Sequence, residues 1–317
     1  MRIVSRLPFG SHGMDLPVIT LAAPAAGPTV VVTANIHGDE CTGIGAILEL
    51  LPLLEAGLRR GTVHLYPSLN PEGLERRSRK APEDDQDLNR LFPGDPRGSP
   101  SERQAALIWA DLSARRPALL IDLHTDAPDA IPYALVDRAT ALRGTDRSHL
   151  EAQCRRLADA SGLTVLQEYP DAYYTRFRLD RSLTGATLNR LRTPAITLEC
   201  GPRLYLESGA TATMRAALLG VLHAVDLVAE APPPHPSRIS GAWRRDAGPR
   251  ASVAGILLPR SRPGLMLRRG EAVAELRSLT GEKQEELVAD ANGFVVSYAE
   301  RSHVVAGVPV CTFGFEE

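Results

Sequence analysis

Short apolar runs rich in β-branched residues alternate with longer helix-like segments through most of the chain. The runs read TVVVTAN, VHLYPSLN, ALLIDLH and AITLECG and occupy residues 29–35, 63–70, 118–124 and 195–201. The helical patterns occupy residues 43–57, 101–116, 148–162 and 211–231, with Ser101 as the expected cap of the second. Because these runs are apolar enough to be buried on both faces, they predict an α/β domain with a mostly parallel mixed sheet flanked by helices.

A proline-rich segment, EAPPPHPSR, interrupts this alternation near residue 231. It can continue neither a helix nor a strand, so we expect a domain over 1–231 and a linker over 232–238. Residues 239–317 contain short strand-like segments between glycines and charged turns, without a helical period. This pattern predicts a small all-β C-terminal domain of the barrel or sandwich type.

Composition narrows the function classes. The chain has 36 basic and 38 acidic residues and a formal charge of −2, which argues against a nucleic-acid partner. All basic residues except Lys80 and Lys283 are arginines, which indicates either composition bias or anion recognition. The chain offers neither an apolar run of about 18 residues nor a signal-peptide pattern, so we expect a cytoplasmic protein without membrane association.

The loop after the first strand-like run reads Asn-Ile-His-Gly-Asp-Glu over residues 35–40. An imidazole at His37 and a carboxylate at Glu40 can converge on one cation, while Gly38 lets the backbone turn tightly. The HxxE spacing alone is weak, since most such pairs belong to ordinary polar loops.

His124 ends the run ALLIDLH and is predicted at the carboxyl end of its strand. Such ends face one crevice in a parallel sheet, so His37, Glu40 and His124 could meet there. Two imidazoles, one carboxylate and an open fourth position form the ligand set of a catalytic zinc hydrolase. Asp122 should face the same way as His124, either as an acceptor for its imidazole or as a buried structural aspartate.

Two further elements carry polar groups in unusual settings. The segment DLNRLFPG holds Asn89 and Arg90 before a Phe-Pro-Gly turn, an arrangement suited to binding a carboxylate, although a solvated charged loop is the plain alternative. Glu199 lies inside the apolar run AITLECG, where a carboxylate is costly unless it is paired or functional. By contrast, His64 and His223 are interpreted as structural histidines, and the insert DAYYTRFRLD with Tyr173 and Tyr174 as a surface loop.

Together and in this order, these motifs resemble the succinylglutamate desuccinylase/aspartoacylase family, a branch of the zinc carboxypeptidase-like superfamily. The matching pieces are HGDE, NPEG, DLNRLFPG, DLHT and TLECG. The resemblance runs from about Pro17 to about Gly201 and continues more faintly through the C-terminal β segments. Asp126 after DLHT and the sequence Cys200-Gly201-Pro202 depart from the usual family pattern, so we expect the rim of the pocket to differ.

The resemblance implies a role for each matching residue. His37, Glu40 and His124 would ligate one zinc ion, and Glu199 matches the family's general base. Asn89 and Arg90 match its clamp for a substrate carboxylate. An arginine that polarises the scissile carbonyl aligns with Arg76, Arg77 or Arg79, and the spacing to the NPEG turn favours Arg79.

The expected function is therefore a zinc-dependent amidohydrolase or deacylase. It would hydrolyse the amide bond of an N-acyl amino acid, or of a related small carboxylate-bearing amide, through a zinc-bound water activated by Glu199. A metallocarboxypeptidase that cleaves a peptide or cell-wall peptide is the alternative within the same chemistry. A binding protein that keeps the fold without catalysis is disfavoured because all three ligands and Glu199 are present. The sequence leaves the acyl group, the amine and a homo-oligomeric state open.

Overall fold

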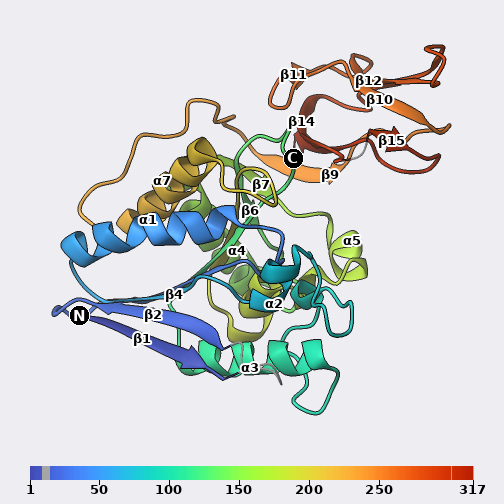
Figure 1. Ribbon diagram of the computed structural model, residues 1–317. Helices are drawn as coiled ribbons and strands as arrows, with labels where there is room; N and C mark the ends of the chain where they lie inside the picture. The colour runs from blue at the N-terminus through green and yellow to red at the C-terminus, as the bar shows by residue number, and fades with distance from the viewer. Residues whose placement is uncertain (9–14, 301, 317) are drawn as a thin grey trace.

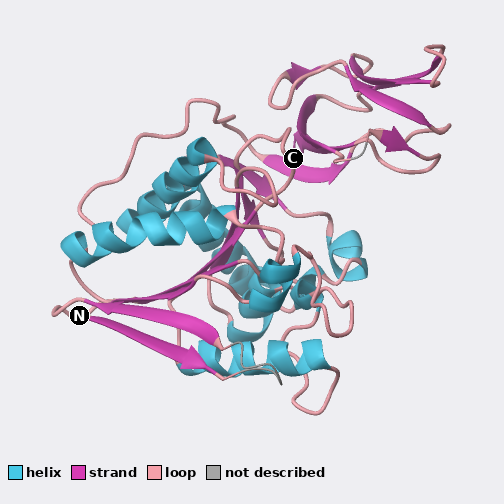
Figure 2. Ribbon diagram, viewed as in Figure 1, coloured by secondary structure: helices cyan, strands magenta, loops and turns pink. Residues whose placement is uncertain are grey.

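One sheet of twelve strands runs from the N-terminal part of the chain into its C-terminal part, and helices cover both faces of its first portion (Figures 1 and 2). This computed structural model describes residues 1–8, 15–300 and 302–316. The strand order is β1-β2-β4-β3-β5-β8-β6-β7-β9-β16-β14-β11, and β13-β12-β10-β15 form a second, smaller sheet. The sheet order confirms the predicted mixed α/β architecture and adds strands on both sides of its parallel centre.

The strands of the first part of the chain are β1 (Arg2–Leu7), β2 (Leu16–Ala22), β3 (Thr29–Ala34), β4 (Thr62–Tyr66), β5 (Leu119–His124), β6 (Tyr133–Val136), β7 (Thr164–Gln167) and β8 (Ala195–Glu199). The α-helices are α1 (Thr42–Gly57), α2 (Pro71–Arg76), α3 (Pro100–Ala114), α4 (Gly144–Ala160), α5 (Asp171–Arg176), α6 (Leu183–Ala186) and α7 (Ser208–Ala224). Three short helical turns, η1 (Leu88–Arg90), η2 (Leu179–Arg181) and η3 (Thr187–Leu191), complete this part.

The four predicted strands are β4, β3, β5 and β8, which lie side by side and parallel. Among the boundaries that differ from the prediction, two have a clear local cause. The second run ends as a strand at Tyr66, because the chain turns into α2, whose first turn is capped by the Asn70 side chain. The last helix stops at Ala224 instead of continuing to residue 231, since Asp226 adopts a positive φ of 59° that a helix cannot contain.

Several elements were not predicted. β1 and β2 add an antiparallel pair at one edge, and β6 and β7 are only four residues long. The insert interpreted as a loop contains the helix α5, and the Tyr174 side chain is buried. The cap of α3 is Ser99 and not Ser101: its hydroxyl accepts from the Glu102 amide, while the Glu102 carboxylate accepts from the Ser99 amide.

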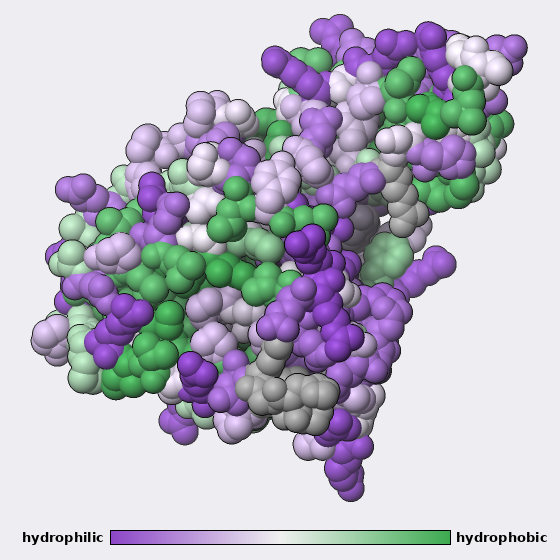
Figure 3. All heavy atoms as spheres, in the orientation of Figure 1, coloured by the Kyte–Doolittle hydropathy of each residue, from purple (hydrophilic) through white to green (hydrophobic). Residues whose placement is uncertain are grey.

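Each face of the sheet has its own core. Because side chains alternate along a strand, Val30 and Val32 of β3 pack on one face with α1, α4 and α7, while Val31 packs on the other with the α3 and α6 layer. Apolar surface gathers at the left of the view in Figure 3, the region that α1 and the N-terminal strands occupy in Figure 1. None of the described helices combines the length and apolar character needed to cross a bilayer.

The region after the proline-rich segment consists of strands in every described element, as predicted. These are β9 (Trp243–Ala247), β10 (Gly255–Pro259), β11 (Met266–Leu267), β12 (Ala272–Arg277), β13 (Lys283–Val288), β14 (Gly293–Tyr298), β15 (His303–Val304) and β16 (Cys311–Glu316). β9 pairs in parallel with β7, through Leu166 opposite Trp243, so the large sheet continues across the predicted linker. The C-terminal region is therefore connected to the first part in two ways, by the covalent linker and by the pairing of β9 with β7.

Candidate active site and metal centre

The predicted site residues meet at the carboxyl ends of three neighbouring strands. β5 lies between β3 and β8, and Glu199 pairs directly with His124 across the parallel ladder. The loop that follows β3 brings His37 and Glu40 to the same edge. Since parallel strands end at a common edge of the sheet, alternation of strand and helix suffices to bring together three segments that are far apart in the sequence.

His37, Glu40 and His124 form a buried group suited to one metal ion. One ligand atom from each lies within 4.8 Å of the others, and none of the three residues is more than 4% exposed. Glu40 bridges both imidazoles: its Oε1 lies 2.8 Å from Nδ1 of His37, and its Oε2 lies 2.8 Å from Nδ1 of His124. The donor set fits a zinc ion, which takes imidazole nitrogen and carboxylate oxygen ligands and keeps an open position in catalytic sites.

A second carboxylate contacts the outer nitrogen of each imidazole. Asp122 Oδ2 lies 2.9 Å from Nε2 of His124, and Asp87 Oδ1 lies 3.3 Å from Nε2 of His37. A proton on each Nε2 would point to its carboxylate, leaving the Nδ1 lone pair directed to the centre. Burial lowers the pKa of His124, but Asp122 and Glu40 more than offset this and raise it well above its usual value.

Backbone packing fixes the loop that carries His37 and Glu40. The Asn35 side-chain amide donates to the carbonyls of His37, Gly38 and Glu40 at 3.0 to 3.1 Å. The predicted tight turn is present, since the Glu40 amide donates to the His37 carbonyl at 3.0 Å. Space gives a further reason for glycine: a Cβ at Gly38 would lie 2.1 Å from the backbone carbon of Gly73. Gly38 is therefore required by the close approach of this loop to α2.

Of the three candidate arginines, Arg79 lies at the candidate metal centre. Its Nη1 donates to Glu40 Oε1 at 3.0 Å, and its Nη2 lies 3.6 Å from Asp87 Oδ2. Arg76 instead pairs with Glu72 at the surface, and Arg77 ends α2 in a left-handed conformation. The guanidinium of Arg79 thus faces the cavity that the metal centre borders.

Asn89 and Arg90 also line this cavity, and local bonds hold both in place. Asn89 Oδ1 accepts from the Leu183 amide at 2.7 Å, and its Nδ2 lies 3.3 Å from Nε2 of His124. Arg90 Nη1 donates to the Asn89 carbonyl at 2.6 Å. Both the side-chain and the backbone oxygen of Asn89 therefore accept hydrogen bonds within the protein. The side-chain NH2 group of Asn89 and the remaining donors of Arg90 are left to bind a ligand.

Glu199 faces the cavity with one carboxylate oxygen buried and free of hydrogen bonds. This oxygen, Oε2, has no partner among the described residues, and neither has the buried hydroxyl of Thr125. Burial raises the pKa of Glu199 to about 8; Glu40 and Asp126 add to the rise, while His124 opposes it. A carboxyl group with such a pKa can both accept and release a proton near neutral pH.

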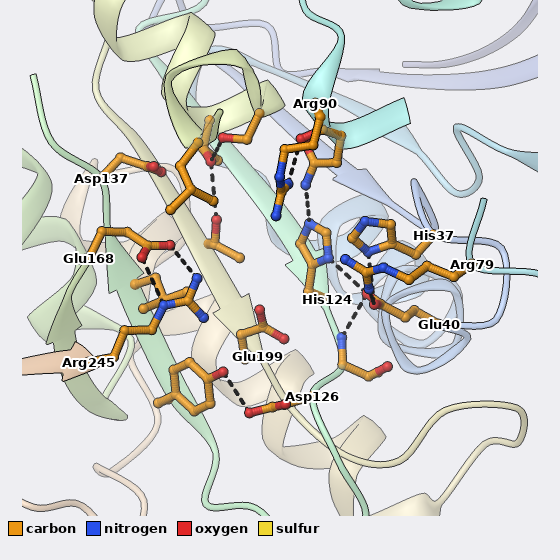
Figure 4. Close-up of a pocket in the computed structure, with 18 of the residues that line it drawn as sticks. His37, Glu40, Arg79, Arg90, His124, Asp126, Asp137, Glu168, Glu199 and Arg245 are labelled. Carbon is orange, nitrogen blue, oxygen red and sulfur yellow. Dashed lines mark hydrogen bonds and ion pairs between the residues drawn. The ribbon is translucent and has the colours of Figure 1, made fainter. Parts of the chain in front are cut away.

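The opposite end of the cavity is built by residues that sequence reasoning missed. Asp137, Glu168 and Arg245 lie there, with Arg90 and Glu199 between them and the metal centre (Figure 4). Asp137 follows the overlooked run YALV, whose apolar character is a sequence signal although its four residues are too few to show a period. Arg245 comes from β9, beyond the proline-rich segment, and no local pattern connects it with the site. Asp87, also missed, lies inside the DLNR motif itself.

The cavity has a volume of about 190 Å³, below the several hundred Å³ usual for drug-sized ligands. It is lined mainly by charged and hydroxyl-bearing side chains. The Tyr133 hydroxyl donates to Asp126 Oδ2 at 2.9 Å beside Glu199, so the family departure at residue 126 does form part of the wall. The arrangement can hold a small polar molecule against a metal ion, a carboxyl group and two arginines.

Comparison with known proteins agrees with this geometry. The model of the succinylglutamate desuccinylase/aspartoacylase catalytic domain matches residues 26–225. The N-alpha-acetyl-L-2,4-diaminobutyric acid deacetylase of Halomonas elongata is 36% identical over 118 residues, covering 37% of this chain and 34% of that protein. The succinylglutamate desuccinylase of Pseudomonas paraeruginosa is 28% identical over 198 residues, covering 59% and 54%. The chain thus spans about half, or less, of the length of each of these two relatives.

Solved structures share the fold over a larger part of the chain. A succinylglutamate desuccinylase/aspartoacylase structure from Rhodobacter sphaeroides superposes with a TM-score of 0.82 at 22% identity, covering 100% of this chain and 95% of the other. A metallo-carboxypeptidase from Burkholderia cenocepacia gives a TM-score of 0.57 at 18% identity, covering 71% and 64%. The family model spans well over half of the chain. The chain therefore belongs to the succinylglutamate desuccinylase/aspartoacylase family.

Proposed function

We propose that the protein is a zinc-dependent amidohydrolase that releases the acyl group from a small N-acyl amino acid. One observation carries the proposal: the group His37, Glu40 and His124 and the free Oε2 of Glu199 face the same small cavity. Membership of a family whose relatives include deacylases of amino acids supports the same reaction class.

His37, Glu40 and His124 would hold the zinc ion. When bound, zinc supplies Lewis-acid polarisation of a carbonyl and lowers the pKa of water to about 7. The carboxylates of Asp122 and Asp87 would keep the two imidazoles in the orientation that ligation needs.

The remaining groups position the substrate and move the proton. Arg90 and the Asn89 NH2 group would bind the substrate carboxylate, which fixes the amide within the cavity. Arg79 would donate to the carbonyl oxygen as negative charge develops on it. Glu199 would take the proton of the attacking water and deliver it to the departing amine. The products are a carboxylic acid and a free amino acid.

A carboxypeptidase acting on a peptide is the second candidate, since the fold is shared with a metallo-carboxypeptidase. The volume of about 190 Å³ favours the smaller substrate. The cytoplasmic location, the absence of nucleic-acid and membrane partners and a homo-oligomeric state remain predictions.

The experiment is a hydrolysis screen with the zinc-loaded protein. Formyl, acetyl and succinyl derivatives of amino acids are compared with short peptides, and the released amine is quantified. We expect release from at least one class of N-acyl amino acid and little or none from peptides. Release from peptides alone would replace the proposal with the carboxypeptidase, and no release from either class would refute both.

A further inference from the structure

Three charged residues form a row at the end of the cavity opposite the metal centre. Val136, Gln167 and Arg244 are aligned across the parallel strands β6, β7 and β9. Asp137 and Glu168 come directly after β6 and β7, and Arg245 is the next residue within β9. The row therefore lies at the carboxyl ends of β6 and β7, along the cavity wall that also contains Glu199 and Arg90 (Figure 4).

The charges in this row do not cancel. Arg245 binds Glu168 with two bonds, Nε to Oε2 at 2.8 Å and Nη2 to Oε1 at 2.5 Å, so these two residues neutralise each other. Asp137 is 3% exposed and accepts hydrogen bonds from the Tyr174 hydroxyl, at 2.7 Å, and from the Thr184 hydroxyl. Among the ion pairs between described residues, none includes Asp137. The buried carboxyl group of Asp137 thus has no ion-pair partner among the described residues.

The surroundings of Asp137 would favour a cationic ligand. Burial, and next the charge of Glu168, raise the pKa of Asp137 to about 7. The hydrogen bonds from Tyr174 and Thr184 and the charge of Arg245 oppose this rise only in part. A cation that enters the cavity would form an ion pair with Asp137 and stabilise its ionised form. A carboxylate placed there would instead meet two acidic side chains, while the arginine beside them is already engaged.

The spacing of the row from the metal centre matches an extended small molecule. β6 is antiparallel to β8, with Tyr133 opposite Glu199 and Leu135 opposite Thr197. Asp137 lies four residues beyond Tyr133, or roughly 13 Å along the strand at the usual rise per residue. The side chains of Glu199 and Asp137 both reach into the cavity, so a ligand that contacts both can be shorter than this distance. Arg90 lies between the ends. Burial lowers its pKa, and the charges of Asp87 at one end and Glu168 at the other oppose this change.

We propose that Asp137, supported by the Glu168–Arg245 pair, is a specificity residue that binds an ammonium group of the substrate. The substrate class is then the N-acyl diamino acid, with its α-carboxylate at Arg90, its amide at the metal centre and its side-chain amine at Asp137. This inference rests on the proposed amide hydrolysis for the orientation of the ligand. The inference predicts weak binding of any substrate that places a carboxylate at Asp137, such as one whose succinyl group points to that residue.

The test measures binding separately from turnover. Isothermal titration calorimetry on the zinc-loaded Glu199→Gln variant compares Nα-acetyl-lysine and Nα-acetyl-ornithine with neutral Nα-acetyl-norleucine and with Nα-acetyl-glutamate. We expect at least one ammonium-bearing amide to bind about 10- to 100-fold more tightly than the neutral one, as for a hydrogen bond to a charged group. Adding Asp137→Asn should remove this preference, while the exposed Asp146→Asn should leave it intact.

Equal or weaker binding of both ammonium-bearing amides would overturn the inference, and so would a preference that survives Asp137→Asn. If the Asp137→Asn variant does not fold, the comparison of the four amides on the Glu199→Gln variant still tests the inference. The same four amides are also offered to the wild-type protein. Hydrolysis without an ammonium preference refutes only this inference, whereas an ammonium preference in binding without any hydrolysis refutes only the proposed reaction.

Discussion

Glu199 and His124 are directly paired residues at the ends of the neighbouring parallel strands β8 and β5. Paired residues on adjacent strands project from the same face of a sheet. One of them belongs to the candidate metal group, and the other has a carboxylate oxygen without a hydrogen-bond partner. The register of two strands therefore sets the Glu199 carboxyl group beside His124 of the candidate metal group, independently of any loop.

Replacing Glu199 by Gln should lower kcat for amide hydrolysis by about 10²- to 10⁴-fold, the usual contribution of a general base. The amide cannot accept the proton of water, but it keeps the size of the side chain. Zinc content, measured on the same preparation, should remain that of the wild type. Near-normal kcat in this variant would show that another group takes the proton.

Arg79→Ala should lower kcat by about 10²-fold or more, since it removes a donor for the charge that develops on the carbonyl oxygen. Arg76→Ala is the matched control, because Arg76 is an exposed neighbour paired with Glu72. Steady-state kinetics of both variants check the assignment. Equal losses in the two would contradict it, and a loss in Arg76→Ala alone would transfer the role to Arg76.

Gly38→Ala should destabilise the protein by about 1–3 kcal/mol and weaken zinc binding, because the new Cβ would meet backbone atoms of Gly73 that cannot rotate away. Gly57→Ala provides the control: it lies at the end of α1 and has no atom within 4 Å of its Cβ position. Urea unfolding with zinc titration distinguishes them. A Gly38→Ala protein as stable as Gly57→Ala would show that the loop can move.

The parts of the fold that the sequence predicts are those set by local pattern. The strand runs ending at Ala34, His124 and Glu199 are buried on both faces and contain β-branched residues, so they are recognisable without their neighbours. β1 is different: it lies at the edge of the sheet, and five of its six residues are exposed, so its period carries little information. The four-residue strands β6 and β7 are too short to show a period.

The residues of the candidate site also fall into those that local sequence pattern can predict and those that it cannot. His37, Glu40 and His124 could be predicted because each follows a recognisable strand and offers a ligand group. Arg245 could not, since its place depends on the pairing of β9 with β7 across the proline-rich segment. That pairing is a tertiary contact between residues about 77 positions apart, as in the bond from Arg245 to Glu168. Local propensity says nothing about it.

His64 should make stability depend on pH in a defined range. Its Nδ1 lies 2.9 Å from the Thr20 hydroxyl and 2.8 Å from Arg115 Nη1, and because arginine can only donate, the neutral ring presents its Nδ1 lone pair there. Burial and then Arg115 lower its pKa from 6.5 to about 4. The unfolded chain thus binds this proton more readily, and the contribution present above pH 6.5 is lost as pH falls toward 4.

Wild type should lose about 1–2 kcal/mol more than His64→Gln over this range, after allowance for partial solvent exposure. Urea unfolding of both proteins at several pH values between 4 and 7 measures the difference. Parallel stability curves would show that His64 titrates normally in the folded protein.

Metal removal is the most direct test of zinc-dependent hydrolysis at His37, Glu40 and His124. The purified protein is stripped with a chelator, assayed on the N-acyl amino acid that it hydrolyses best, and then titrated with zinc while bound metal is counted. We expect activity to disappear with the metal and to return in proportion to zinc, saturating near one ion per chain, with no recovery in His124→Ala. Undiminished hydrolysis by the metal-free protein would contradict zinc-dependent catalysis at this site.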